Sequence, residues 1–300
     1  MTIEAKIIAD SVSPADVRIT TMQLRYPRFI HSEFMTHRVF SRNASSSRAI
    51  PVERMIEDLR RDPAMPVFWG SNKPGMQAGE QLSEAEIDLC KISWFDAMHN
   101  AIRYAEELIA SGLHKQIANR ILEPWAHINV VVTATEWLNF FNLRIHPDAQ
   151  PEIMQLAGQM LKAYTESTPK ELQPGEWHLP FADRPEDIEQ AKAQITGNGV
   201  MRVVPSDWQI SEILRKVSVA RCARVSFLTH DGRETTLEED QKLYDRLVGS
   251  KPIHASPAEH QGTPDEGVQR GFGVTWMKPQ LHGNFKGWIQ HRKVLELEIK

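Results

Sequence analysis

Apolar residues recur at two spacings along the chain, and each spacing predicts a different kind of element. Between residues 17 and 24, Val, Ile, Met and Leu alternate with Arg, Thr and Gln, which predicts a half-buried strand. The short apolar run 128–132 predicts a second strand. Helical spacing predicts helices over residues 29–38, 51–61, 83–112, 114–122, 136–144, 151–166, 207–226 and 235–248.

The longest predicted helix begins at a capping box, in which Ser83 is followed three residues later by Glu86. Its apolar positions include Leu89 and Ile92, and Gly112 is expected to end it. We interpret this helix as part of the core scaffold.

The predicted elements favour an α+β fold, with an antiparallel or mixed sheet flanked by long helices. Residues 166–205 contain five prolines and little periodicity, so we expect a long irregular connection. The chain is therefore divided into a signature-bearing α/β part (1–170), an irregular connection (171–205) and a C-terminal part (206–300) that completes the same single domain. Residues 251–275 are rich in Pro, Gly and His and are interpreted as a functional loop, while 287–299 is not classified.

Composition narrows the class of protein. The formal net charge of the 300 residues is −4, so bulk attraction to a nucleic-acid polymer is not expected. Cys90 and Cys222 form no disulfide framework and have no metal-type spacing, which favours a reducing, cytoplasmic setting. No apolar run approaches membrane-spanning length, and the charged N-terminal residues do not form a signal-peptide core.

The densest candidate chemistry lies in residues 37–48. This stretch supplies one imidazole, three guanidinium groups, four hydroxyls and one carboxamide, followed by Pro51 at the predicted start of a helix. Guanidinium forks, hydroxyls and the N–H groups of a helix start all bind phosphate oxygens. The stretch predicts a pocket for an anionic ligand, and the alternative is a serine-rich surface loop.

Two other arginines, Arg120 and Arg144, stand in apolar surroundings and need partners. A structural ion pair, for example of Arg144 with Asp148 or Glu152, is one interpretation. A guanidinium aimed at a ligand carbonyl or phosphate is the other.

The segment 254–260 holds two histidines and a glutamate, for which a metal site is conceivable. The simpler interpretation starts a short helix at Ser256 and leaves His254 at a loop edge, where it could stack on a flat ring; we therefore expect no metal. The chain has no dinucleotide-binding glycine motif, Walker-type loop or nucleophile elbow.

The stretch from Thr36 to Ala49 resembles the signature of the flavin-dependent thymidylate synthases, Arg-His-Arg-x-x-Ser-x-Asn-Glu-x-Ser-x-Arg-Tyr. Residues 118–124 resemble the family's Ala-Arg-x-x-Leu-Pro block. Residues 138–144 and 149–153 resemble its Asn-Phe-Leu-x-Leu-Arg and Ala-Gln-x-Glu-Ile blocks. Agreement of several blocks in order is far more specific than one.

Elements with which this family normally begins stand near the end of this chain. They are the Ala-Ala-Arg-Val-Ser-like run 222–227, the Asp/Leu-rich helix 240–247 and the His-x-Ser-Pro-like segment 254–260. Residues 287–292 echo the segment that precedes the signature. The resemblance therefore implies a circularly permuted version of the fold, with a partial second copy of one element at the C-terminus.

The resemblance also implies roles for individual residues. It places His37, Arg38, Ser41 and Asn43 at FAD, with Asn139 below it. It assigns Ser46, Arg48 and Arg120 to the nucleotide phosphate, and Arg144 to a uracil carbonyl. It sets His254 near the flavin or folate and Ser256 against the cofactor. Among these, Arg144, Ser46 and His254 are the candidate catalytic residues, and Glu33 joins the substrate-binding set.

Five positions depart from the family pattern. Thr36 and Thr135 replace arginines, Ala44 replaces Glu, Ala49 replaces Tyr, and Glu33 replaces Gln. Loss of two guanidiniums should weaken binding of the FAD phosphates by roughly 1.5–3 kcal/mol per contact. A carboxylate at residue 33 would repel a phosphate unless it turns away.

The implied reaction is flavin-dependent methylation of dUMP to dTMP, with methylenetetrahydrofolate as carbon donor and NADPH as reductant. The alternatives are a related methylation or hydroxymethylation of dUMP or dCMP, and a non-catalytic nucleotide-binding protein that kept the fold. The family also implies a homo-oligomer, a tetramer or a dimer, and a permuted variant suits a phage genome.

Overall fold

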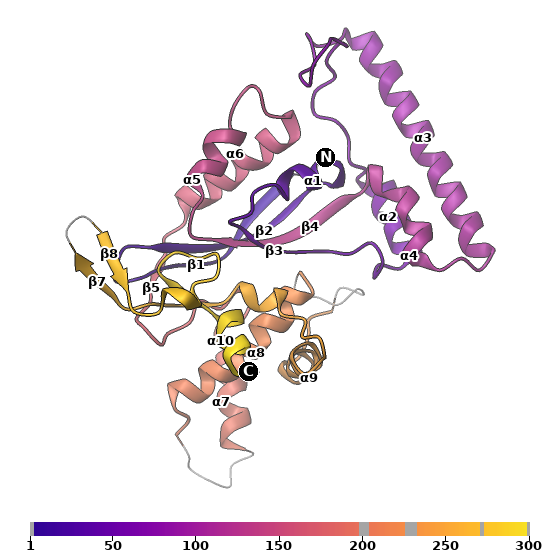
Figure 1. The fold of residues 1–300 in the computed structure, drawn as a ribbon. Coiled ribbons are helices and arrows are strands. Elements are labelled where there is room, and N and C mark those ends of the chain that lie inside the picture. The colour runs from indigo at the N-terminus through magenta and orange to yellow at the C-terminus, as the bar shows by residue number, and fades with distance from the viewer. Residues whose placement is uncertain (1–2, 198–203, 226–232, 271–272, 299–300) are drawn as a thin grey trace.

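A five-stranded sheet runs through the middle of the molecule (Figure 1). The computed structural model describes residues 3–197, 204–225, 233–270 and 273–298. The sheet contains β1 (Glu4–Val12), β2 (Arg18–Pro27), β3 (Ser41–Ala44), β4 (His127–Ala134) and β5 (Lys170–Glu171), in the order β3-β4-β2-β1-β5. All neighbours are antiparallel except β1 and β5, so the sheet is mixed and the predicted α+β class is confirmed.

The two predicted strands are confirmed as β2 and β4, which pair in register from Thr20 opposite Ala134 to Pro27 opposite His127. β1 and β3 were not predicted. β1 carries charged residues that break the apolar alternation, and β3 consists of Ser, Arg, Asn and Ala. Both strands owe their structure to pairing with a neighbour, which no local pattern reveals.

One face of the sheet is apolar. Met22 and Leu24 of β2 and Val130 and Val132 of β4 are fully buried on this face. They pack in the same core as residues of α5 (Leu138–Arg144) and α6 (Pro151–Glu166), the two helices above the sheet in Figure 1. Both helices were predicted, and α6 has the predicted bounds.

The opposite face of the sheet is covered by the C-terminal half of the chain (Figure 1). Val131 of β4 packs there with Phe181, Cys222 and Val225. The helices on this side are α7 (Pro185–Thr196), α8 (Asp207–Ala223), α9 (Leu237–Val248), the short 3₁₀ helix η3 (Ser256–Glu259) and α10 (His291–Glu298). The predictions for α8 and α9 are confirmed, except that Ser226 and Phe227 lie outside the described residues.

Two sequence interpretations of this half were wrong. The irregular connection 171–205 contains α7, and the loop 251–275 contains β6 (Gly262–Pro264), β7 (Gly267–Arg270) and the start of β8 (Gly273–Trp276). β6 pairs with β9 (Trp288–Gln290), and β7 with β8. A further 3₁₀ turn, η4, spans Pro279–Leu281. Pro180 precedes α7, and Pro185 is its first residue, a position where proline is tolerated because it has no N–H to leave unpaired.

Buried charges join α7, α8 and α9. The side chain of Arg221 is 1% exposed and binds Asp187 of α7 through two hydrogen bonds of 2.8 Å. Its Nε donates to Asp240 of α9 at 2.8 Å, and Asp240 also pairs with Arg224. These three helices therefore meet at an ion cluster rather than only at an apolar seam.

A second apolar core lies beside the sheet. It is formed by α2 (Val52–Arg61), α3 (Glu84–Ala110), α4 (Lys115–Ala118) and the 3₁₀ helix η2 (Asn119–Trp125). The capping box at Ser83 is confirmed, and α3 contributes Met98 and Ile102 to this core as predicted, but Leu89 (65%) and Ile92 (56%), which were expected in its apolar set, are exposed. The predicted helix 114–122 is instead α4 continued by η2, which contains Pro124.

The chain between β2 and β3 turns through two short helices, η1 (Arg28–Ile30) and α1 (His31–Phe34). They occupy most of the predicted helix 29–38, which ends earlier than expected. None of the described helices is both long and apolar enough to cross a membrane.

Candidate functional site

The segment from residue 33 to residue 48 is held in place by Arg42 of β3. Its Nη1 donates to the carbonyls of Phe34 (3.3 Å), Met35 (3.0 Å) and His37 (2.9 Å), which end α1 and form the following turn. Because side chains alternate along a strand, Ser41 and Asn43 point to the other face of the sheet. β3 thus separates two groups of polar side chains, one on each face.

The first group surrounds Arg144, the last residue of α5. Its Nε donates to His37 Nε2 at 2.9 Å, one Nη forms an ion pair with Glu33, and the other donates to Thr36 Oγ1 at 3.3 Å. The guanidinium is 17% exposed, so this arrangement faces solvent at one edge.

The suggested ion pair of Arg144 with Asp148 or Glu152 was wrong. Glu152 is buried and accepts from the backbone N–H of Val67 at 2.8 Å, while Asp148 accepts from Gln77. The partner of Arg144 is Glu33, a residue more than a hundred positions away. Because Glu33 points at the guanidinium, its carboxylate is compensated locally.

His37 is neutral in this cluster. Burial, together with the charges of Arg144 and Arg42, lowers its pKa to about 4. Neutrality is required by the geometry, because Nε2 accepts the hydrogen bond from Arg144. The ring contacts Phe140 edge-on, with centroids 4.8 Å apart, and this packing fixes the imidazole.

The second group lies where β3 meets η3 and β9. The Asn43 amide is 3.1 Å from His260 Nε2 and faces the carbonyl of Ser256. Ser41 Oγ donates to Asn284 at 3.1 Å and accepts from Gln290 at 3.3 Å. Two of the residues expected at a cofactor, Ser41 and Asn43, are therefore joined to the C-terminal half of the chain.

A third group follows β3. Ser47 Oγ donates to Glu123 at 2.5 Å, and Glu123 also pairs with Arg120 at 2.8 Å and Arg28 at 3.1 Å. The fully buried Asn119 donates to the carbonyls of Ser47 (2.7 Å) and Ile50 (2.9 Å). These bonds fix the turn before α2, in which Ser46 and Arg48 lie.

The remaining predicted residues have exposed side chains. They are Arg38, Ser46, Arg48, Asn139, His254 and Ser256. Ser46 and Arg48 precede α2, whose N-cap is Pro51. Asn139 lies in the first turn of α5. The described contacts do not join these side chains to one another.

The described residues contain no group of three or more His, Cys, Asp or Glu side chains placed to hold a metal ion. The two histidines of 254–260 diverge, since His254 is exposed while His260 is buried. The helix start expected at Ser256 is confirmed as η3.

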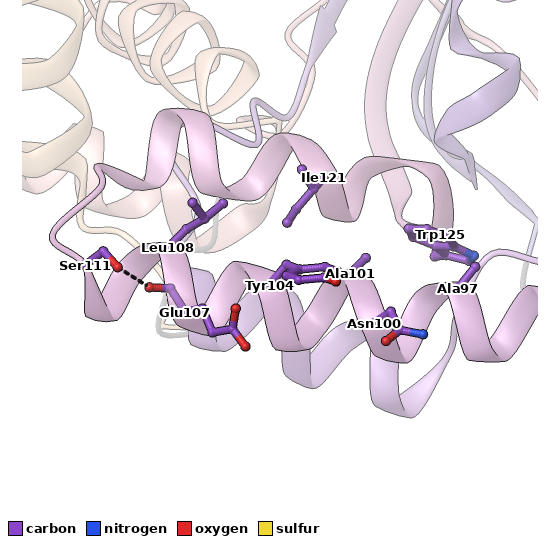
Figure 2. A pocket seen from close by; sticks show the side chains of 9 residues that line it. All are labelled: Ala97, Asn100, Ala101, Tyr104, Glu107, Leu108, Ser111, Ile121 and Trp125. Carbon is purple, nitrogen blue, oxygen red and sulfur yellow. Dashed lines mark hydrogen bonds between the residues drawn. The ribbon is translucent and has the colours of Figure 1, made fainter.

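A cavity of about 730 Å³ lies elsewhere, between α3 and η2 (Figure 2). Tyr104, Leu108, Ile121 and Trp125 contribute most of its apolar wall. The residues that line it carry none of the chemistry described above, so this cavity and the candidate site are separate.

Sequence reasoning missed the residues that hold the site together. They are Asn119, Glu123, Thr133, His178, Asn284 and Gln290, and His260 was considered only as a possible metal ligand. Asn119 and Glu123 stand within the recognised block 118–124, next to Arg120, and could have been noted. The others contact the site through long-range packing that leaves no local pattern.

Comparison with known proteins shows the family to which this chain is related. Residues 5–170, more than half of the chain, match the family model described as thymidylate synthase complementing protein. The flavin-dependent thymidylate synthase of Thermosipho africanus (strain TCF52B) is 26% identical over 162 residues, which are 52% of this chain and 68% of that protein.

Two solved structures of a UMP/dUMP methylase, PolB from Streptomyces cacaoi, bound with 5-Br UMP and with 5-Br dUMP, are 20% identical. Each match covers 55% of this chain and 89% or 90% of the other, with TM-scores of 0.47 and 0.46. The family match, which includes the signature-like stretch and the blocks after it, confirms the resemblance. The chain therefore belongs to the thymidylate synthase complementing protein family, and with it to the flavin-dependent thymidylate synthase enzymes.

Proposed function

We propose that this protein methylates dUMP to dTMP with bound FAD, methylenetetrahydrofolate as carbon donor and NADPH as reductant. The observation that carries the proposal is the clustering of Arg144, His37 and Glu33, all of which lie within residues 5–170, the part of the chain that matches the family model. This arrangement holds a guanidinium, 17% exposed and paired with Glu33, beside an imidazole that packs on buried aromatic rings.

The donors present fit a flavin dinucleotide. Arg38 has an exposed guanidinium, and Ser256 and Asn139 have exposed polar groups. Asn43 is half-buried with its amide anchored on one side. In the proposal these residues hold FAD together with His37 and Ser41, and the flavin would extend past β3, the edge strand that lies between the two polar groups. The flavin supplies the redox chemistry, while the chain binds and orients the rings.

The nucleotide phosphate is assigned to Ser46, Arg48 and Arg120. Glu123 offsets part of the charge of Arg120, so Arg48, which is exposed, is the stronger anion-binding group. Arg144 is assigned to a pyrimidine carbonyl, where its charge would favour negative charge on the ring. His254 is assigned to stack on a ring, and Ser46 to lie close to the reacting nucleotide.

The compensation of Glu33 by Arg144 supports binding of a nucleotide despite the change from the family's Gln. A carboxylate that is held by a guanidinium repels a nearby phosphate less than a free one does. Glu33 is therefore retained in the substrate-binding set as the residue that orients Arg144.

We further infer that the fold is circularly permuted. The family match ends at residue 170, whereas elements expected at the start of the family pattern lie beyond residue 206. Their placement supports the inference, because the segment 254–260 lies against β3 and Cys222 packs on β4. In this view residues 206–300 complete the domain begun by 1–170.

A homo-oligomer, dimer or tetramer, is also proposed. The exposed apolar side chains of Leu89, Ile92 and Tyr104 on α3 and Ile117 on α4 support it, because a partner subunit could cover them. A related reaction, methylation or hydroxymethylation of dUMP or dCMP, is the second candidate. A third candidate is a non-catalytic nucleotide-binding protein that kept the fold, and the features that favour it are Thr36, Ala44 and Thr135, which depart from the family pattern.

Product analysis tests the reaction. Protein loaded with FAD is incubated separately with dUMP and with dCMP, in each case with methylenetetrahydrofolate and NADPH. The masses of the nucleotides are then measured by mass spectrometry. A product one methyl group heavier than dUMP is expected. Unchanged dUMP together with a modified dCMP would favour the second candidate, and no product from either would indicate a nucleotide-binding protein without this activity.

Arg48→Ala is expected to weaken dUMP binding about 10- to 100-fold, because a hydrogen bond to a charged group contributes roughly 1.5–3 kcal/mol. Arg48 is exposed, so the fold should be unaffected. Calorimetric titration with dUMP measures the change. Arg54→Ala on the surface of α2 is the matched control, and equal affinities of both variants would contradict the phosphate assignment.

A further inference from the structure

A continuous line of buried polar side chains crosses the sheet and ends at Asn43. Ser11 Oγ is 2.9 Å from His178 Nδ1, and His178 Nε2 is 2.8 Å from Thr21 Oγ1. Thr21 Oγ1 is 2.7 Å from Thr133 Oγ1, which is 2.8 Å from His260 Nδ1. His260 Nε2 reaches the Asn43 amide at 3.1 Å. The line therefore connects β1, β2, β4 and β3 in the plane of the sheet.

Both imidazoles of this line are neutral. His178 and His260 are fully buried, and burial lowers the pKa of each to about 3. A neutral imidazole has one N–H donor and one acceptor nitrogen. Each threonine hydroxyl between the rings has one hydrogen, so if both hydroxyls donate within the line, all its bonds run in one direction and one end of the line sets that direction.

Asn43 is the end that decides. The amide atom next to His260 Nε2 also lies 3.2 Å from the carbonyl oxygen of Ser256 and 3.2 Å from that of Arg42. Carbonyl oxygens only accept, so this atom is the NH₂ nitrogen, whose two hydrogens are shared among the three acceptors and which cannot itself accept from His260. His260 Nε2 then accepts, and the proton of its ring stands on Nδ1.

The rest of the line follows in one direction. His260 Nδ1–H donates to Thr133, the Thr133 hydroxyl donates to Thr21, and the Thr21 hydroxyl donates to His178 Nε2. His178 Nδ1–H donates to Ser11. Each ring nitrogen has a partner of the right kind, which a buried polar network needs in order to be stable.

We propose that His260 is a positioning residue, which holds the Asn43 amide so that its Oδ1 faces the cofactor as a hydrogen-bond acceptor. The acceptor would take an N–H or O–H donor of the flavin. This role rests on the proposed function, because it needs Asn43 to contact FAD. The Asn43 orientation itself depends only on the protein.

The tautomers of the two histidines test the direction of the line without any ligand. Full-length protein labelled with ¹⁵N is measured by two-bond proton–nitrogen correlation at pH 7, and His260→Gln and His178→Gln identify the signals. Both rings are expected as Nδ1–H tautomers. An Nε2–H tautomer at His260 would reverse the direction of hydrogen-bond donation along the line. It would also require the opposite orientation of the Asn43 amide and so overturn the proposal.

Binding of FAD tests the consequence. His260→Leu removes the acceptor for the Asn43 NH₂ and is expected to raise the Kd for FAD about tenfold, the effect of losing one well-placed hydrogen bond. His260→Gln offers a carbonyl acceptor and an N–H donor and should restore Kd to within about threefold of wild type. If His260 only filled space in the core, His260→Gln would not restore the affinity for FAD.

The outcomes separate the two proposals. Wild-type affinity of His260→Leu, or equal loss in both variants, would overturn the positioning role. If wild-type protein bound no FAD, the proposed function would fail, and an Nε2–H tautomer at His260 would still overturn the orientation of Asn43 independently.

Discussion

Arg144→Met is expected to lower kcat about 10²- to 10³-fold while FAD stays bound. In the proposed function its guanidinium stabilises negative charge that develops on the pyrimidine ring, and removal of one such preorganised donor typically costs this much. The effect should fall on kcat, because the interaction is made chiefly as charge develops. Steady-state rates of dTMP formation at saturating dUMP measure it.

The matched control is Arg103→Met, an arginine on the surface of α3 that pairs with Glu107. It should change neither kcat nor the affinity for FAD. Glu33→Gln is a useful companion, since it keeps a hydrogen-bonding partner for Arg144 but removes the carboxylate charge. Turnover of Arg144→Met within about threefold of wild type would show that Arg144 does not act on the ring.

Arg221→Met is expected to lower the free energy of unfolding by about 3–5 kcal/mol. The change removes the cation between Asp187 and Asp240 and leaves two buried carboxylates with fewer partners. Methionine fills part of the volume but offers them no donor. Urea unfolding followed by circular dichroism measures the loss.

Lys216→Met on the same helix is the control. Lys216 forms a half-exposed pair with Glu212 at 3.7 Å, and such surface pairs contribute about 0–1 kcal/mol. If Arg221→Met were no less stable than this control, the ion cluster would not hold α7, α8 and α9 together.

The parts of the fold with strong local signals were predictable. Alternation predicted β2, a short apolar run predicted β4, and the capping box at Ser83 marks where α3 begins. The apolar periodicity of residues 151–166 gave α6 with its bounds. In each of these cases local propensity and tertiary packing favour the same structure.

The misses share a physical cause. β1 is stabilised by pairing with β2 although its own sequence is charged, and α7 is fixed by the buried Asp187–Arg221 pair. The apolar residues of α3 predict a buried helix, but Leu89 and Ile92 are more than half exposed while Met98 and Ile102 are buried. Long-range partners decide these features, and a local pattern does not record them.

The candidate site also contains residues that were predicted from local sequence and residues that were not. Residues 37–48 were recognised from their density of donors, and Arg144 joins His37 as a shared site requires. Three features could not be deduced, because each depends on segments more than 60 positions apart. They are the ion pair of Arg144 with Glu33, the hydrogen bonds from Asn119 that fix the turn before α2, and the line from Ser11 to Asn43. The roles of the exposed residues remain predictions.

The most direct measurement of the central claim is a crystal structure of the protein soaked with FAD and dUMP. The account predicts flavin density against His37, Ser41 and Asn43, and a nucleotide whose phosphate lies at Ser46 and Arg48 with its ring at Arg144. Density for either ligand far from residues 33–48, with these side chains in contact only with solvent, would contradict it.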